Sequence, residues 1–370
     1  MRRIKLCDIC DFQGGSQPPK NQWIDSPQYG YIRMLQIRDF TQSEKVKPEY
    51  IKITSSSKVC NEDDILIARY GASVGKILTG LAGAYNVAIM KTIPDEEKIS
   101  KRFLFYFLSS QYFQNYIMNV GSRAAQAGFN KDDLQGISLK EYSLKEQADI
   151  CSILDEINVI IKKRKKQLKY IENVVKSRFI ELFGDPVNNP FGFEKQILKN
   201  TCKIITGNTP SRAVGEYYGD YIEWIKTDNI VTGLLNPTKA TEYLSKKGVD
   251  AGRTVEKNSI LMACIAGSIE SIGRVCITNR TVSFNQQINA LVPAKYNVLF
   301  LYVLLQISKD YLVKDINMAL KGILSKSRLE GKEFIVPPIE LQNQFANFIA
   351  QTDKSKYYNF TSYKYCVLAA

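Results

Sequence analysis

Between Leu144 and Phe183 the chain contains neither glycine nor proline, and its apolar residues recur with a heptad spacing. Such spacing keeps apolar side chains on one face of an α-helix and is typical of a coiled-coil seam. Ser143 can cap the start, and Gly184 followed by Pro186 ends the helix. We therefore predict one helix, roughly 60 Å long at 1.5 Å per residue. Its predicted seam consists of Ile150, Leu154, Ile157, Ile161, Leu168, Ile171, Val175 and Leu182.

The segments on either side of this helix repeat one pattern at a shift of 190 to 199 positions. YIRMLQIRDF begins at Tyr31 and YIEWIKTDNI begins at Tyr221, while Gln147 of LKEQ corresponds to Gln342 of IELQ. Few residues are identical, but the order and spacing of the anchors are preserved. Because internal repeats define the architecture of a chain, we predict two diverged copies of one module.

Each copy places short β-type runs first, at 64–70 and 259–266, with glycine- and serine-rich turns between them. Helical stretches follow near 100–118 and 297–318. Strands and helices in separate runs predict an α+β fold: two similar mixed α/β domains joined by long coiled-coil helices. The predicted boundaries are 1–143 for the first domain, 144–186 for the central helix, 187–336 for the second domain and 337–370 for a second helical segment.

The second helical segment is a candidate partner for the first. Phe345 and Ile349 occupy the positions that Ile150 and Leu154 hold in the first copy. An antiparallel pair of such helices forms a rod with one domain at each end. The next heptad positions are Thr352, Lys356 and Tyr363. Because apolar residues are missing there, we expect this second segment to be truncated relative to the first and to leave part of the seam uncovered.

The charge of the chain favours a polyanionic partner. The 370 residues carry 50 basic and 37 acidic side chains, a net charge of +13. The excess is spread over both domains, with 19 basic against 15 acidic residues in 1–143 and 19 against 13 in 187–336. Nucleic acid is the usual partner of such a surface, and the alternative is a basic protein without one. The basic run 162–166 surrounds the helix, which favours a solvated face over a phosphate-binding stripe.

Cysteine usage argues against a metal site. The eight cysteines are scattered, only Cys7 and Cys10 are closely spaced, and the chain contains no histidine. We expect free thiols in a reducing compartment and no bound metal. The start of the chain lacks the apolar core of a signal peptide, and the apolar runs 103–108 and 298–305 are too short to span a bilayer. These features predict a cytoplasmic protein.

Two catalytic interpretations are weak. The segment Asn189–Phe191 contains the amide and first proline of an adenine methyltransferase motif, but it lacks the second proline and has no glycine-rich cofactor loop upstream. The carboxylates after Pro94 are adjacent, so they cannot surround a nuclease metal from separate strands. The absence of histidine also removes the commonest general base. We expect no catalytic residues in this chain.

Four stretches carry a family resemblance: 14–20 (GGSQPPK), 146–186, 207–230 (GNTPSRAVGEYYGDYIEWIKTDNI) and 283–293 (SFNQQINALVP). Segment 207–230 resembles the opening of a target recognition domain, and 146–186 is similar to a central spacer helix, both of the specificity subunit of type I restriction–modification systems. The resemblance covers nearly the whole chain.

This resemblance implies a non-catalytic, DNA-recognising subunit. Each target recognition domain would read one half of a bipartite site in double-stranded DNA, and half-sites about one helical turn apart suit such a rod. The spacer helices would dock two methyltransferase subunits, which restriction subunits join. S-adenosylmethionine, ATP and Mg would bind the partner subunits and none would bind this chain. The alternative is a stand-alone DNA-binding or coiled-coil scaffold protein without restriction partners.

The DNA-contacting residues are expected in loops bounded by the repeated strands, because base edges and phosphates need polar or cationic side chains. In the first copy the candidates are Lys20, Arg38, Arg69, Tyr70, Ser73, Lys76 and Arg123. In the second copy they are Thr209, Ser211, Arg212, Lys226, Ser268, Arg274, Gln286 and Lys321.

Overall fold

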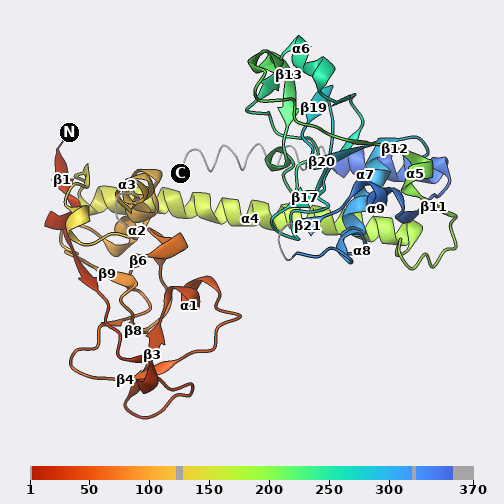
Figure 1. Ribbon diagram of the computed structural model, residues 1–370. Coiled ribbons are helices and arrows are strands. Elements are labelled where there is room, and N and C mark those ends of the chain that lie inside the picture. Colours follow the sequence, from red (N-terminus) through yellow and green to blue (C-terminus); the bar gives the residue numbers. More distant parts are fainter. Residues whose placement is uncertain (1, 122–127, 319–321, 353–370) are drawn as a thin grey trace. The chain divides into compact units, whose positions relative to one another are not determined.

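The computed structural model describes residues 2–121, 128–318 and 322–352 (Figure 1). The chain divides into two compact units, one ending at Ile160 and the other beginning at Ile161. Helix α4 (Leu144–Phe183), drawn in yellow-green in Figure 1, starts in the first unit and ends in the second. Each unit is described by itself below.

The 40 residues of α4 confirm the helix predicted from the sequence. Its start is a reciprocal capping box: the Ser143 N–H donates to Glu146 Oε2 at 2.8 Å, and the Glu146 N–H donates to Ser143 Oγ at 3.3 Å. At its end the Gly184 N–H donates to the Ile180 carbonyl at 2.8 Å. Gly184 has a φ of +69°, a conformation that glycine adopts without strain, so this residue ends the helix.

In its described residues, 2–121 and 128–160, the first unit has two four-stranded sheets and one strand pair. The first sheet has the order β2 (Cys10–Gly14), β9 (Ile89–Pro94), β6 (Leu66–Ala68), β7 (Ile77–Leu78), with all neighbours antiparallel. The second has the order β4 (Tyr50–Lys52), β3 (Tyr31–Leu35), β8 (Gly83–Tyr85), β5 (Val59–Cys60), and β3 runs parallel to β8. The pair joins β1 (Arg3–Lys5) to β10 (Ser138–Lys140). The helices are α1 (Ile37–Thr41), α2 (Lys101–Ser109) and α3 (Gln111–Gly121).

The second unit repeats the strand order and the strand directions of both four-stranded sheets. Its first sheet has the order β12 (Cys202–Thr206), β20 (Ile288–Pro293), β16 (Ile260–Ala263), β18 (Val275–Ile277). Its second has the order β14 (Tyr243–Leu244), β13 (Tyr218–Ile225), β19 (Val282–Phe284), β15 (Thr254–Val255), with β13 parallel to β19. The remaining pairs are β11 (Lys195–Ile197) with β22 (Glu333–Ile335) and β17 (Ile265–Ala266) with β21 (Gly322–Ile323).

Its helices are α5 (Leu198–Thr201), α6 (Lys246–Ala251), α7 (Val298–Ile307), α8 (Lys309–Val313) and α9 (Lys326–Glu330), and residues 339–352 are also helical. The register supports the duplication as well: Cys10 pairs with Pro94 in the first unit, and Cys202 pairs with Pro293 in the second. Matching strand order, direction and register confirm the repeat that the sequence predicted.

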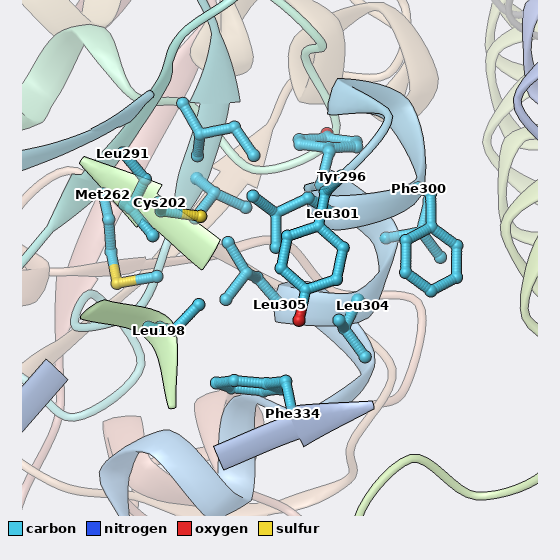
Figure 2. Close-up of a cluster of buried hydrophobic side chains, with 14 of the residues drawn as sticks. Leu198, Cys202, Met262, Leu291, Tyr296, Phe300, Leu301, Leu304, Leu305 and Phe334 are labelled. Carbon is cyan, nitrogen blue, oxygen red and sulfur yellow. The ribbon is translucent and has the colours of Figure 1, made fainter. Parts of the chain in front are cut away.

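The core of the second unit is built on α7. Its run VLFLYVLL places Phe300, Leu301, Leu304 and Leu305 in an apolar cluster with β12, β16, β20 and β22 (Figure 2). The end of α4 joins this cluster, because the Phe183 ring lies 4.8 Å from the Phe300 ring between centroids. Phe345 of the helix 339–352 is fully buried in the same cluster. Within this unit, therefore, α4 and helix 339–352 are anchored by one core.

Two equivalent buried glutamines attach a helix start to each core. Gln147 of α4 accepts the Ser100 N–H at 2.9 Å and donates to the Lys98 carbonyl at 2.8 Å. In the second unit Gln342 accepts the Asn297 N–H at 2.9 Å and donates to the Pro337 carbonyl at 2.8 Å. Each glutamine thus accepts the N–H of the residue that caps α2 or α7, and its amide group donates to a backbone carbonyl of the same unit.

The predicted seam of α4 is buried mainly at its ends. Ile150 packs against the first core, and Val175 and Leu182 pack against the second. The half-buried remainder, which joins no apolar cluster of the described residues, is Leu154, Ile157, Ile161, Leu168 and Ile171. Lys356 and Tyr363, on which the expected truncation of the second segment rests, lie outside the described residues.

Burial governs the chemistry of the cysteines. It raises the pKa of the Cys10, Cys202 and Cys264 thiols to about 12, so these thiols stay protonated and unreactive at neutral pH.

Over residues 2–121, 128–318 and 322–352 no helix is both long and apolar enough to cross a bilayer.

Candidate nucleic-acid interface

Two of the predicted cations of the first copy meet at one carboxylate. Lys20 Nζ pairs with Glu49 Oε1, and Arg38 Nη2 lies 2.6 Å from Glu49 Oε2. Lys20 Nζ also lies 3.8 Å from the centroid of the Trp23 ring, a favourable cation–π distance. Gln36 Nε2 donates to Glu49 Oε2 at 3.1 Å. Both carboxylate oxygens of Glu49 are therefore occupied by groups that the sequence places 11 or more positions away.

The second copy builds the same arrangement from other residues. Arg212 Nη2 lies 2.5 Å from Glu242 Oε2, and Lys226 Nζ pairs with Glu242 Oε1. The Arg212 guanidinium lies 4.5 Å from the Tyr218 ring centroid, and Lys226 Nζ lies 5.1 Å from the Trp224 ring centroid. We call Lys20, Arg38 and Glu49 the first cation–glutamate cluster, and Arg212, Lys226 and Glu242 the second.

The two glutamates occupy equivalent places in the fold. Each precedes the tyrosine that starts an edge strand, Tyr50 in β4 and Tyr243 in β14. The Glu49 carbonyl accepts the Met34 N–H of β3 at 2.7 Å. The Glu242 carbonyl accepts the N–H of Trp224, the equivalent residue of β13, at 3.0 Å. Backbone pairing thus fixes each glutamate at the edge of the second sheet.

A buried polar cap positions the second cation of each cluster. Asp39 Oδ2 accepts the Gln36 N–H at 2.9 Å at the start of α1, the helix that carries Arg38. Asn229 Oδ1 accepts the Lys226 N–H at 2.9 Å at the equivalent turn. These caps hold the chain at the ends of β3 and β13 and so aim both cations toward the glutamates.

A close backbone approach shapes the loop before each cluster. A Cβ on Gly15 would lie 2.1 Å from the Asn86 carbonyl oxygen, and one on Gly207 would lie 2.2 Å from that of Asn285. Neither distance is sterically possible without movement of the backbone, so both positions require glycine. In the second copy the following Thr209 hydroxyl bonds to the Gln286 side chain, which joins two of the predicted contact residues.

Other candidates of the first copy have internal roles. Arg69 Nε donates to the Phe129 carbonyl at 3.2 Å, Arg69 Nη2 bonds to Asn130 Oδ1, and the guanidinium lies 5.0 Å from the centroid of the Tyr70 ring. Arg69 therefore fastens two loops together. Tyr70 and Lys76 are exposed, and Ser73 is half-buried in the short helix 71–73.

The remaining candidates of the second copy either form no bond to Glu242 among the described residues or lie outside them. Arg274 donates to the Ser271 carbonyl at 3.2 Å and the Thr227 carbonyl at 3.3 Å, and it lines a cavity of about 210 Å³ beside α7. Ser268 Oγ bonds to Ser271 Oγ at 3.1 Å, and Ser211 is exposed. Arg123 of the first copy and Lys321 of the second copy lie outside the described residues.

The glutamates and aromatic rings of the clusters were not among the predicted site residues. A signal for the glutamates exists, because KPEYIKI around Glu49 and ATEYLSK around Glu242 share the dipeptide Glu-Tyr at a shift of 193. In the described part of the chain no group of three or more cysteine or acidic side chains is placed to hold a metal ion.

Comparison with known proteins identifies the family. A sequence profile described as the type I restriction modification DNA specificity domain matches residues 1–170 and again residues 190–358. The chain belongs to this family. The two matches fall on the two copies of the module, which links the structural repeat to the duplicated specificity domain.

Individual specificity subunits resemble the chain to different extents. The specificity subunit of the type I restriction enzyme HindI from Haemophilus influenzae is 33% identical over 106 residues, which cover 28% of this chain and 22% of that protein. The chain thus matches only about a fifth of the length of this relative. The specificity subunit of the type I restriction enzyme MjaIX from Methanocaldococcus jannaschii is 23% identical over 390 residues, covering 93% of this chain and 85% of that protein.

The fold is also known. The fold resembles the crystal structure of the S subunit of a type I restriction–modification system from M. genitalium. The superposition covers 100% of this chain and 93% of that chain, with a TM-score of 0.53 and 14% sequence identity. Two similar mixed α/β domains joined by a long helix are therefore the specificity-subunit fold, as the sequence predicted.

Proposed function

We propose that this chain reads a bipartite sequence in double-stranded DNA, with one half-site for each target recognition domain. The observation that carries the proposal is the duplicated topology, in which each copy presents two predicted cations at an equivalent sheet edge. Cationic side chains contact phosphates and base edges, and two copies of one module suit two half-sites. The net charge of +13 supports the same function.

The chain would act without chemistry of its own. Methyltransferase subunits would dock on α4, which exposes the apolar side chains of Ile153, Ile160 and Val174, and restriction subunits would join that core. The partners would bind S-adenosylmethionine, ATP and Mg and carry out methylation and cleavage. The assembly would work in the cytoplasm, where bacterial and archaeal DNA is accessible.

Mapping of methylated bases tests this proposal. Cells that express the chain with a cognate methyltransferase should methylate adenines within two short motifs separated by a fixed, non-specific gap. The control is the same methyltransferase without this chain, which should leave those motifs unmethylated. A single uninterrupted motif would count against the two-domain interpretation.

Exchange of one domain tests modularity. Replacing residues 1–143 with the equivalent domain of another family member should change one half of the motif and leave the other half and the gap intact. A simultaneous change of both half-motifs would contradict independent reading by the two domains.

A further inference from the structure

We infer that Glu49 and Glu242 are specificity-determining residues: each competes with DNA phosphate for two cations and so weakens binding to DNA that lacks the target. This inference rests on the proposed function. It names the phosphate oxygens of duplex DNA as the competing ligand and assigns the competition to one carboxylate in each domain.

The geometry places each carboxylate beside at least one cation that remains accessible. The Lys20 and Arg38 side chains are 59% and 48% exposed, while the Glu49 side chain that holds both is 24% exposed. In the second cluster Arg212 is 59% exposed, while Lys226 and Glu242 are 29% and 32% exposed. A phosphate can therefore reach Lys20, Arg38 and Arg212 from solvent, and it would meet the carboxylate with which each of them pairs.

Carboxylate and phosphate oxygens bind ammonium and guanidinium groups in the same way. A phosphate must therefore share or displace bonds that the glutamate already makes, and its charge is repelled by the carboxylate. Lys20 donates to Glu49 and Lys226 donates to Glu242, and these bonds are the largest cause that lowers the pKa of each glutamate. Both carboxylates consequently stay charged at neutral pH. This cost applies wherever the cations contact phosphate. On the target the cations would instead donate to uncharged base acceptors, which the carboxylate repels less, so the cost is smaller there.

A purely structural role does not account for the arrangement as well. The edge strands are already held by backbone bonds, such as the one from the Met34 N–H to the Glu49 carbonyl, so strand pairing does not need the side chain. The copies have also drawn the second cation from different positions. Lys226 corresponds to Gln36, which donates to Glu49 as well, whereas Arg38 corresponds to Asp228. The glutamate and its pairing with two cations are nevertheless present in both copies.

The test compares Glu49→Gln and Glu242→Gln with the unaltered full-length chain, each assembled with the cognate methyltransferase. Matched controls that also remove one negative charge are Glu141→Gln, whose carboxylate pairs with Arg2 at 3.2 Å, and Glu330→Gln, whose carboxylate pairs with Lys326 at 3.5 Å. Dissociation constants are measured for a random-sequence duplex and for a duplex that carries the motif found by methylation mapping. Each is measured across a salt series, because phosphate contacts set the salt dependence.

Each cluster variant should bind the random duplex roughly threefold to eightfold more tightly. That range is expected when one unit charge is removed about 7 Å from a phosphate in a medium of effective dielectric constant between about 40 and 80. Affinity for the target should change less, so the specificity ratio should fall. The salt dependence on random DNA should become steeper, by about 0.9 in the log–log slope for each additional phosphate that the protein neutralises.

A second measurement ties the effect to the cations. In a Lys20→Gln background, Glu49→Gln should tighten random-DNA binding clearly less than it does in the parent chain, because the two residues share one interaction. The inference is overturned if the cluster variants match the controls, or if target and random duplexes gain equally in affinity. Because the two glutamates lie in separate domains, the binding measurements on one variant still test the inference if the other variant fails to fold. If the parent chain, assembled with its methyltransferase, binds neither duplex, the proposed function itself fails.

Discussion

The buried amide of Gln342 should contribute strongly to the stability of the second domain, and Gln342→Leu measures that contribution. The side chain is fully buried. The substitution leaves the Asn297 N–H and the Pro337 carbonyl without the partners that they now have at 2.9 and 2.8 Å. An unpaired buried polar group costs about 1–3 kcal/mol. Because leucine regains some apolar burial, we expect the free energy of unfolding to fall by about 2–4 kcal/mol.

The chain supplies a reporter for each domain, since its two tryptophans are Trp23 in the first unit and Trp224 in the second. In a Trp23→Phe background, tryptophan fluorescence follows the second domain alone during urea unfolding. With a urea m-value of about 2 kcal/mol/M, the midpoint should fall by about 1–2 M. The control Gln344→Leu alters an exposed glutamine on the same helix and should leave the midpoint nearly unchanged.

The converse experiment uses Gln147→Leu in a Trp224→Phe background, where the first domain should lose a similar amount. The reasoning is refuted if Gln342→Leu shifts the midpoint no further than Gln344→Leu does. It is also refuted if the second-domain change lowers the first-domain transition equally, because the bonds described are confined to one core.

Three further changes test other parts of the second domain. Gly207→Ala should weaken DNA binding, because the new Cβ would lie 2.2 Å from the Asn285 carbonyl oxygen and displace the loop before the second cluster; electrophoretic mobility shifts measure this. Phe179→Ala should lower the free energy of unfolding by about 3–5 kcal/mol, measured in urea, because its fully buried ring fills the core beside α7. The hydrogen bond from Arg280 is the main cause that lowers the pKa of Glu223. The ion pair therefore stabilises the fold at neutral pH, and this stabilisation is lost as the pH falls through the lowered pKa. The free energy of unfolding of Glu223→Gln, measured in urea, should accordingly depend less on pH in this acidic range.

Each of these has a contradicting outcome. Unchanged DNA affinity together with an unchanged unfolding midpoint in Gly207→Ala would mean that the loop accommodates a side chain. A loss below about 1 kcal/mol in Phe179→Ala would mean that the core collapses around the cavity. An acid profile of Glu223→Gln that parallels the parent would show that the ion pair with Arg280 contributes little in solution.

The sequence was most informative where the physical signal is local. The bounds of α4 follow from a run without glycine or proline, the Ser143 cap and the Gly184 stop, all of which the structure contains. The duplication follows from anchors that keep their order, and the strand orders of the two units match them. Periodicity and helix caps depend on neighbouring residues, so they can be read before the fold is known.

The candidate interface was less predictable, because its geometry depends on distant partners. Residue type favoured Arg69 as a DNA contact, but its guanidinium bonds to Phe129 and Asn130, about 60 positions away in the sequence. Glu49 carries the sign of charge that a DNA-binding surface normally avoids. It reaches Lys20 only because the next residue, Tyr50, pairs with Ile24 through two backbone hydrogen bonds. Such pairings are visible in the sequence only when the two copies are aligned through the Glu-Tyr dipeptides.

The strand pairs that close each unit have a consequence for how new specificities arise. Arg3 at the start of the first unit pairs with Lys140 at its end, and Lys195 pairs with Ile335 in the second. The first and last strands of each recognition domain therefore lie side by side, as in domains that tolerate transplantation. A gene segment exchanged between two such strands would arrive as a self-contained cassette. Under the proposed function, exchange of one such cassette would replace half of the recognised sequence and leave the sequence of the receiving helix unchanged.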